Sequence, residues 1–262
     1  ASRMTEGTVR IFQQATTLHV VPINLIGVSI STAAFPRLTE RLSENRIDLF
    51  KDELRSVIRA IVWLALPVAI ITYFTRGYVV SFISHRGNSL MAGLLGVFAV
   101  AILFRCLYHI LARSFYAQQD TKTPLYISIV AISLNVFLAI WFTFSLRYGA
   151  YGLAVAQAIV AIVEVVILFT MMEMRTPGVL NKYFWQGILR MASAAGFMSI
   201  ICYFMVHWLP FEAGARSLYE AVPKFILIVL VSLSTYLMLS RLLQIKESEP
   251  VMRKLRKVFF RA

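Results

Sequence analysis

The sequence is organised around the stretch Leu111-Ala112-Arg113-Ser114-Phe115-Tyr116-Ala117-Gln118-Gln119-Asp120-Thr121-Lys122-Thr123-Pro124. It ends one long apolar segment with Arg113, a cation that suits the negative end of a helix dipole. Three residues that commonly cap helix N-termini follow: Asp120, Thr121 and Thr123. Pro124 suits the first position of a new helix. On these grounds alone the stretch predicts a capped turn between two helices.

Long apolar runs extend along the chain on both sides of this turn. Of its 262 residues 59% are hydrophobic and 15% are charged, whereas soluble domains carry about 25% charged residues. A bilayer core requires about 20 apolar residues in a helix. The predicted fold class is therefore an all-α polytopic membrane protein with about seven transmembrane helices. We expect them at residues 8–35, 57–74, 90–115, 124–146, 151–172, 187–208 and 223–243.

The formal net charge of +13 would indicate nucleic acid binding in a soluble protein. In a polytopic membrane protein the placement of the charge matters more, because cationic loops stay on the cytoplasmic side. Loops taken alternately along the chain hold 17 and 6 Lys and Arg residues. The richer set covers residues 36–56, 113–124, 173–190 and 241–262, which predicts a cytoplasmic C-terminus and no nucleic acid partner.

This orientation places the N-terminus outside, which is difficult to achieve without a signal peptide. The opening Ala1-Ser2-Arg3 has no initiator Met and lacks the basic-then-apolar pattern of such a peptide. We therefore expect a C-terminal part of a longer protein, with the preceding span cut away.

The first expected span carries a row of polar residues at steps of three, four or seven: Arg10, Gln14, Thr17, Asn24 and Ser31. At helical spacing they share a face, and such a face is rarely exposed to lipid. It would either pack against neighbouring helices or line a watery cavity, and five aligned polar side chains favour the cavity. Pro22 predicts a kink near the middle of this helix.

Four further polar residues lie deep in other expected spans: Arg105, Asn135, Gln157 and Glu164. Glu164 is the only acidic residue within any of the spans, and such residues usually face a cavity or a cation. Arg105 and Arg59 are its candidate partners. The alternative is that Glu164 is protonated, or lies near enough to the inner surface to reach water.

The sequence contains no phosphate-binding Gly-rich loop, HExxH motif, nucleophile elbow or paired carboxylates, so we expect no enzyme. Its four histidines lie on separate segments. Cys106 and Cys202 have no CxxC spacing and are expected to be buried residues rather than a disulfide or metal site. We therefore expect neither a metal nor a cofactor.

Several stretches of the chain resemble the MviN/MurJ family of bacterial lipid II flippases. The nearest match is the opening stretch above, whose motif positions are Tyr116, Asp120, Thr121, Thr123 and Pro124. Further matches are Ala1-Ser2-Arg3 with Glu6-Gly7, Pro22 with Gly27-Val28, Thr32-Ala33-Ala34-Phe35-Pro36-Arg37-Leu38, His85-Arg86-Gly87 and Tyr148-Gly149-Ala150-Tyr151-Gly152-Leu153-Ala154. The resemblance covers residues 1 to about 172 and is specific in combination.

The resemblance implies helices eight to fourteen of a fourteen-helix flippase. Residues 1–174 would form the C-terminal lobe without its first helix, 175–246 two additional transmembrane helices, and 247–262 a basic cytoplasmic tail. Such a protein flips undecaprenyl-pyrophosphate-linked peptidoglycan precursor across the bacterial cytoplasmic membrane by alternating access, for cell-wall synthesis. Its implied partners are this lipid, the bilayer and the N-terminal lobe of the same protein.

The resemblance also assigns roles to the polar residues. The substrate-cavity candidates are Arg10, Gln14, Thr17, Asn24, Ser31 and Arg105, and the ion-coupling candidates are Asn135, Gln157 and Glu164. Thr17 stands where the family often has a cavity arginine, so the anion site would depend on Arg10, Arg105 or the other lobe. Ala139 stands in place of an acid one turn after Asn135, which argues against sodium coupling and leaves membrane potential open.

Three alternative functions remain at this point. A flippase for another lipid-linked oligosaccharide, or a drug exporter of the same superfamily, would share the fold. A membrane scaffold without transport activity is disfavoured by the polar face of the first span. An integral-membrane transferase is disfavoured because the sequence shows no catalytic cluster.

Overall fold

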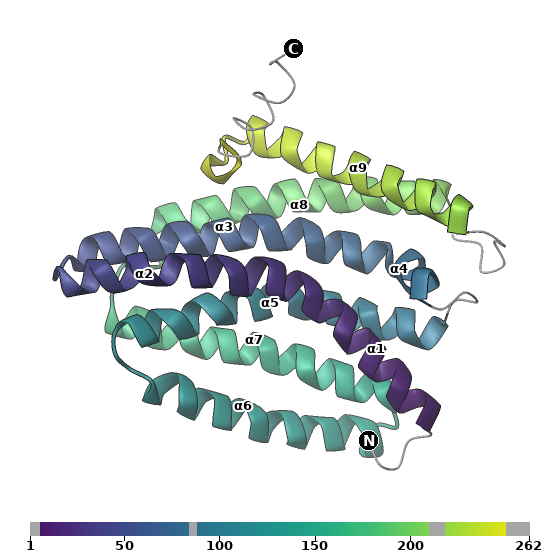
Figure 1. The fold of residues 1–262 in the computed structure, drawn as a ribbon, viewed down its shortest axis with the longest axis horizontal. Helices are drawn as coiled ribbons and strands as arrows, with labels where there is room; N and C mark the ends of the chain where they lie inside the picture. The colour runs from purple at the N-terminus through teal and green to yellow at the C-terminus, as the bar shows by residue number, and fades with distance from the viewer. Residues whose placement is uncertain (1–5, 84–87, 210–217, 250–262) are drawn as a thin grey trace.

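The structure, a computed structural model, describes residues 6–83, 88–209 and 218–249, and every regular element in these ranges is a helix (Figure 1). The elements are α1 (Glu6–Pro22), η1 (Ile23–Val28), α2 (Ser29–Ser43), α3 (Ile47–Phe74), α4 (Arg76–Ile83), α5 (Ser89–Ala117), α6 (Lys122–Ile140), η2 (Trp141–Ser145), α7 (Ala150–Arg175), α8 (Lys182–Trp208), α9 (Leu218–Leu242) and η3 (Lys246–Ser248). Within the described ranges seven helices are long and apolar enough to cross a membrane. The prediction of an all-α polytopic protein is therefore confirmed.

Three stretches singled out in the sequence lie outside the described residues. They are the opening 1–3, the 85–87 element and the part of the basic tail beyond residue 249.

The first span departs from α-helical geometry where the kink was predicted. Pro22 has no N–H to donate, and the next six residues form the π-helix η1. Ser29 Oγ donates to the Asn24 carbonyl at 3.0 Å within this widened turn. A Cβ on Gly27 would lie 2.7 Å from Cys106 Cα, so the missing side chain lets η1 approach α5 closely. Figure 1 shows α1 and α2 running in different directions on the two sides of η1.

The helix that follows the first span is longer than expected. We expected the second span at residues 57–74, whereas α3 is one unbroken helix from Ile47 to Phe74. Phe50 and Leu54, in its first turns, are fully buried in the main core. Arg37 Nη1 of α2 lies 3.2 Å from Glu53 Oε1, which ties the two helices together.

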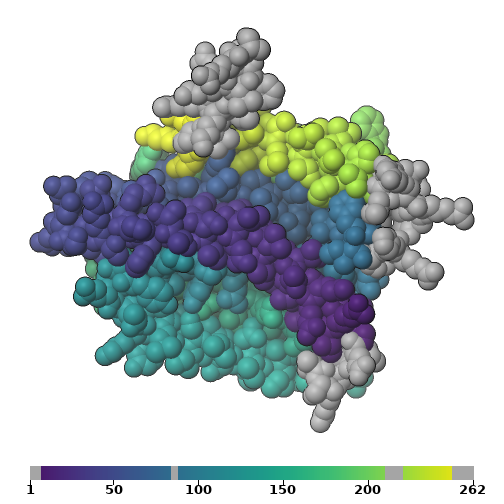
Figure 2. All heavy atoms as spheres, in the orientation of Figure 1, coloured from purple at the N-terminus to yellow at the C-terminus, as the bar shows by residue number. Residues whose placement is uncertain are grey.

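α5 is the central helix of the bundle and packs against α1, η1, α2, α3, α4 and α7. More than half of the most apolar stretch of α5 is buried inside the bundle. By contrast, α6 and α9 lie at its edges and are largely exposed. Figure 2 shows α1, η1 and α2 as one band across the face, between the α6 side and the α9 side. The two predicted buried cysteines, Cys106 on α5 and Cys202 on α8, are buried and free.

α8 and α9 pack on each other and reach the remaining helices chiefly through α3 and α4. Two buried hydrogen bonds fix α9 to α3. Trp63 Nε1 donates to Ser240 Oγ at 3.1 Å, and Tyr236 Oη donates to the Trp63 carbonyl at 2.9 Å. This pair of helices therefore forms a layer of its own beside the five-span bundle, and the domain boundaries at 174 and 246 stay predictions.

Candidate functional site

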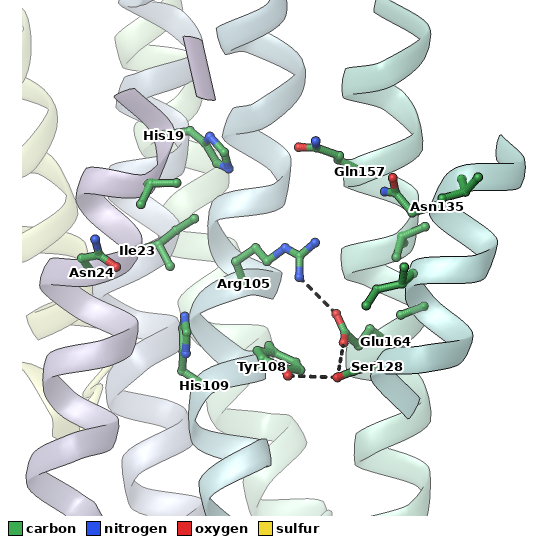
Figure 3. A pocket seen from close by; sticks show the side chains of 15 residues that line it. His19, Ile23, Asn24, Arg105, Tyr108, His109, Ser128, Asn135, Gln157 and Glu164 are labelled. Atoms are coloured by element: carbon green, nitrogen blue, oxygen red, sulfur yellow. Dashed lines mark hydrogen bonds and ion pairs between the residues drawn. The ribbon is translucent and has the colours of Figure 1, made fainter. Parts of the chain in front are cut away.

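A cavity of about 650 Å³ lies between the α1–η1 segment, α5, α6 and α7 (Figure 3). Its polar lining comes from all four walls: His19, Asn24, Arg105, Tyr108, His109, Ser128, Asn135, Gln157 and Glu164. Apolar residues of α1, η1, α6 and α7 complete the lining. Polar side chains on four separate membrane-spanning segments therefore converge on one space, as is usual where a membrane protein handles a polar ligand.

Arg105 occupies the centre of this cavity and pairs with Glu164. Its Nη1 lies 3.1 Å from Glu164 Oε2, and the arginine side chain is 33% exposed while the glutamate side chain is 5% exposed. The Ser128 hydroxyl donates to the other carboxylate oxygen at 3.3 Å and lies 3.1 Å from Tyr108 Oη. The carboxylate is thus enclosed by its partners, whereas the guanidinium faces the open space.

The spacing of these residues along their helices explains the convergence. Arg105, Tyr108 and His109 lie three and four residues apart on α5, and therefore on one face. On α6, Ser128 and Asn135 are seven residues apart, which is two helical turns. The same spacing separates Gln157 and Glu164 on α7. Each of these two helices therefore presents two polar side chains to the cavity, two turns apart.

Two histidines flank Arg105 along the cavity wall (Figure 3). His19 is buried and stacks on Phe98 with ring centroids 4.5 Å apart. Its Nδ1 has no hydrogen-bond partner among the described residues. His109 faces the cavity one helical turn after Arg105. The cavity therefore combines one permanent cation with two imidazoles.

This arrangement suits an anion better than a metal ion. A guanidinium has five N–H donors, and among the described residues Glu164 is the only acceptor that Arg105 contacts. Planar, forked donors of this kind bind phosphates and carboxylates well. In the described part of the chain no group of three or more His, Cys, Asp or Glu residues could hold a metal ion.

The structure brings together only some of the residues singled out in the sequence. Of the substrate-cavity candidates, Asn24 and Arg105 line the cavity, and Arg10, Gln14, Thr17 and Ser31 do not. Arg10 and Thr17 are exposed, Gln14 is half-buried, and Ser31 is buried with no partner among the described residues. The ion-coupling candidates Asn135, Gln157 and Glu164 all line the same cavity as Arg105.

Four polar lining residues were absent from the sequence-based set: His19, Tyr108, His109 and Ser128. His109 carried a usable signal, because it lies four residues after Arg105 and therefore shares its face. Tyr108 and Ser128 carried none, since either residue is ordinary in a membrane helix.

The α5–α6 connection is held by the carboxylate of Asp120. Its Oδ1 accepts from the backbone N–H groups of Lys122 and Thr123, each at 3.0 Å, and its Oδ2 accepts from the Thr123 hydroxyl at 2.6 Å. Arg175, at the end of α7, also pairs with Oδ2. The Thr123 hydroxyl and N–H, followed by Arg175, hold the pKa of Asp120 below its usual value of 3.8.

The expected caps at this connection are arranged differently. Helix α6 begins at Lys122, so Pro124 stands in its third position rather than its first. Thr121 makes no side-chain capping bond. Tyr116 is exposed on the last turn of α5. Asp120 thus supplies the capping interaction and also links this connection to α7.

Comparison with known proteins gives one consistent match. The family model described as lipid II flippase MurJ matches residues 1–223. A probable lipid II flippase MurJ of Thermotoga maritima is 24% identical over 260 residues, covering 97% of this chain and 50% of the relative. One from Vibrio cholerae is 25% identical over 233 residues, covering 83% and 43%. The chain thus spans about half the length of these curated relatives.

A solved structure shares the fold. It is described as lipid II flippase MurJ in an inward closed conformation, and the two superpose with a TM-score of 0.73. The sequences are 20% identical, and the match covers 91% of this chain and 47% of the solved one. The helical arrangement described above is therefore that of one half of this larger membrane protein.

Proposed function

The chain belongs to the MurJ family of lipid II flippases, and we propose that it forms the C-terminal half of a transporter for lipid-linked peptidoglycan precursor. The transporter would move undecaprenyl-pyrophosphate-linked precursor between the leaflets of the bacterial cytoplasmic membrane. It would make and break no covalent bond, so we propose transport and not enzymatic catalysis.

The observation that carries this proposal is the position of Arg105. A pyrophosphate cannot cross hydrocarbon without compensation, because an isolated charge in an apolar medium is very costly. Arg105 offers a cation with unused donors in a cavity of about 650 Å³ at mid-bundle. Substrate sites near the membrane midplane are usual in transporters built from two lobes that rock against each other.

Glu164 has a defined place in this mechanism. With the cavity empty, its carboxylate compensates the charge of Arg105. An arriving pyrophosphate would take over part of that role and would bind Arg105 through the donors that Glu164 leaves unused. Release would restore the Arg105–Glu164 pair. The glutamate therefore limits how tightly the cavity retains its anion.

The partner of this half would be the N-terminal lobe of the same protein. The matches support a separate N-terminal lobe, because they cover only 50% and 43% of the two relatives and leave the rest of each relative without a counterpart in this chain. Residues 1–174 would face that lobe across the cavity, which lies between η1 and the largely exposed α6. Residues 175–246 would be the two additional helices, and 247–262 the cytoplasmic tail.

We propose a cytoplasmic location for the end of the bundle that carries the α2–α3 turn. The α5–α6 connection, the start of α8 and the end of α9 lie at this same end (Figure 1). These connections belong to the loop set that holds 17 of the Lys and Arg residues. The positive-inside rule then directs the C-terminus to the cytoplasm.

Complementation with the full-length protein tests the role of Glu164. In a strain depleted of its own flippase, Glu164→Gln should lower the growth rate and change its pH dependence, with protein level and membrane insertion unchanged. Glu40→Gln, at an exposed position on α2, is the matched control and should support normal growth. Normal growth of Glu164→Gln across the pH range would contradict the role.

A further inference from the structure

A second polar hollow lies far from the cavity, where α8 begins and α9 ends. Its volume is about 330 Å³, and its walls come from α3, α8 and the segment after α9. Three cations face it, Arg59, Arg190 and Lys246, against one carboxylate, Glu249. Two amides, Gln186 and Gln244, also line it. The composition of the hollow is therefore that of an anion site.

The deepest of these cations is already neutralised. Arg59 Nε lies 2.6 Å from Glu247 Oε1, at an angle poor for a hydrogen bond, and Nη2 donates to Oε2 at 3.1 Å. A Cβ on Gly187 would lie 2.5 Å from Arg59 Cζ, so the guanidinium packs directly against the glycine. The ring of Tyr183 covers its other side, with Cζ 4.8 Å from the ring centroid. This part of the hollow is therefore closely packed around a paired guanidinium.

The other two cations remain available for a ligand. Within the described residues, neither Arg190 nor Lys246 forms an ion pair. Lys246 Nζ lies 5.4 Å from the centroid of Tyr183, and Arg190 Nη1 makes one long hydrogen bond, 3.4 Å, to the Leu243 carbonyl. Both side chains are exposed at the rim of the hollow. They can therefore bind an anion without first giving up a carboxylate.

The surface beside the hollow indicates what carries that anion. Two strongly exposed apolar side chains directly precede lining residues in the sequence, Trp185 at 52% and Leu189 at 64%. A third, Leu242 at 73%, lies two residues before Gln244. They lie on α8 and α9, both of which are long and apolar enough to span the bilayer. Hydrocarbon in contact with these residues would be continuous with the hollow. An anion joined to acyl chains fits this surface better than a free one.

We propose that this hollow binds the phosphate headgroup of an anionic phospholipid, held by Arg190 and Lys246, with its acyl chains along α8 and α9. Aromatic and cationic side chains at the water boundary of a membrane protein commonly contact headgroups in this way. The bound lipid would bridge α8 and the end of α9. The site is separate from the Arg105 cavity and does not depend on the transport function.

Native mass spectrometry of the full-length protein in detergent tests the site. Purified protein is titrated with phosphatidylglycerol or phosphatidylcholine, and retained lipids are counted. We expect one more retained phosphatidylglycerol in the wild type than in Arg190→Gln/Lys246→Gln, with affinity about tenfold or more weaker in the variant. Lys122→Gln, which removes an exposed cation at the same end of the bundle, should bind like the wild type.

Two further measurements, on a charge-preserving variant and with free phosphate as a competitor, distinguish the possible explanations. Arg190→Lys/Lys246→Arg keeps both charges and should retain the lipid. Its retention would show that the double Gln variant loses the lipid because it loses the charges, and not because it unfolds. Inorganic phosphate is added as a competitor at concentrations up to those of the lipid phosphate. Equal lipid retention by the wild type and the double Gln variant would overturn the proposal. So would equal retention of phosphatidylcholine, or displacement of the lipid by free phosphate.

Discussion

Removal of the Glu247 carboxylate should destabilise the protein far more than removal of a surface carboxylate. The side chains of Arg59 and Glu247 are 6% and 11% exposed, so Glu247→Ala leaves a buried, uncompensated guanidinium. Breaking a buried pair from one side typically costs about 3–5 kcal/mol. The arginine cannot easily turn toward water, because Tyr183 and Gly187 enclose it.

Glu44→Ala is the matched control. Glu44 Oε2 lies 3.5 Å from Arg41 Nη1 and 3.3 Å from Arg46 Nη1, but its side chain is 39% exposed. Exposed pairs of this kind contribute about 0–1 kcal/mol. The same residue type is therefore removed from an ion pair in two environments that differ in burial.

Thermal denaturation of the full-length protein in detergent, followed by tryptophan fluorescence, measures the difference. Glu247→Ala should lower the midpoint by several degrees and Glu44→Ala by little. The double variant Arg59→Met/Glu247→Leu should recover most of the loss, because apolar residues of similar volume can replace a buried pair. Equal midpoints for Glu247→Ala and Glu44→Ala would refute the reasoning.

Three further predictions concern η1, the α5–α6 connection and the membrane topology. Gly27→Ala should cost about 1–3 kcal/mol in thermal denaturation, because its Cβ would meet Cys106 Cα at 2.7 Å, whereas Gly196→Ala on α8, with nothing within 4 Å, should cost nothing. Asp120 has a lowered pKa, so the stability it contributes is present above about pH 4 and is lost as the pH falls further. Asp120→Asn should therefore lower the midpoint by an amount worth about 1 kcal/mol at pH 7 and progressively less below pH 4, and a constant difference would contradict this. Single cysteines at positions 85 and 214 should react with an impermeant maleimide from outside and those at 45 and 250 should not, and the reverse pattern would invert the proposed topology.

The fold class followed from the sequence because it depends on composition and run length alone. A chain with this many apolar runs of about 20 residues has few alternatives to a helical bundle in a bilayer. The pairing of Glu164 with Arg105 was also within reach, since a lone acid in such a run needs a cation and few are available. Which of Arg105 and Arg59 pairs with Glu164 could be decided only from the structure, in which α5 packs against α7.

The polar face of the first span was less predictable, for a physical reason. The alignment of Arg10 with Ser31 assumes one α-helical period, and η1 interrupts it. A π-helix holds more residues per turn, so positions after residue 28 are rotated relative to those before residue 22. Asn24 faces the cavity, while Ser31 turns into the protein interior.

The Arg59–Glu247 pair could not have been found from the sequence. The two residues are 188 positions apart, and Glu247 follows the last span in a run of ordinary surface residues. Its burial depends on how α9 ends against α3, which no local pattern determines. The glycine that makes room for Arg59 carries no sequence signal either, because glycines are common in membrane helices.

The rate of lipid II movement across reconstituted membranes tests the central claim most directly. Full-length protein in liposomes with fluorescent lipid II should move the lipid between leaflets, and Arg105→Gln should slow this by about tenfold or more, as expected for a lost charge-assisted hydrogen bond. Arg147→Gln, which removes an exposed cation after η2, should leave the rate unchanged. Movement at the wild-type rate in Arg105→Gln would contradict the claim that this cavity carries the pyrophosphate.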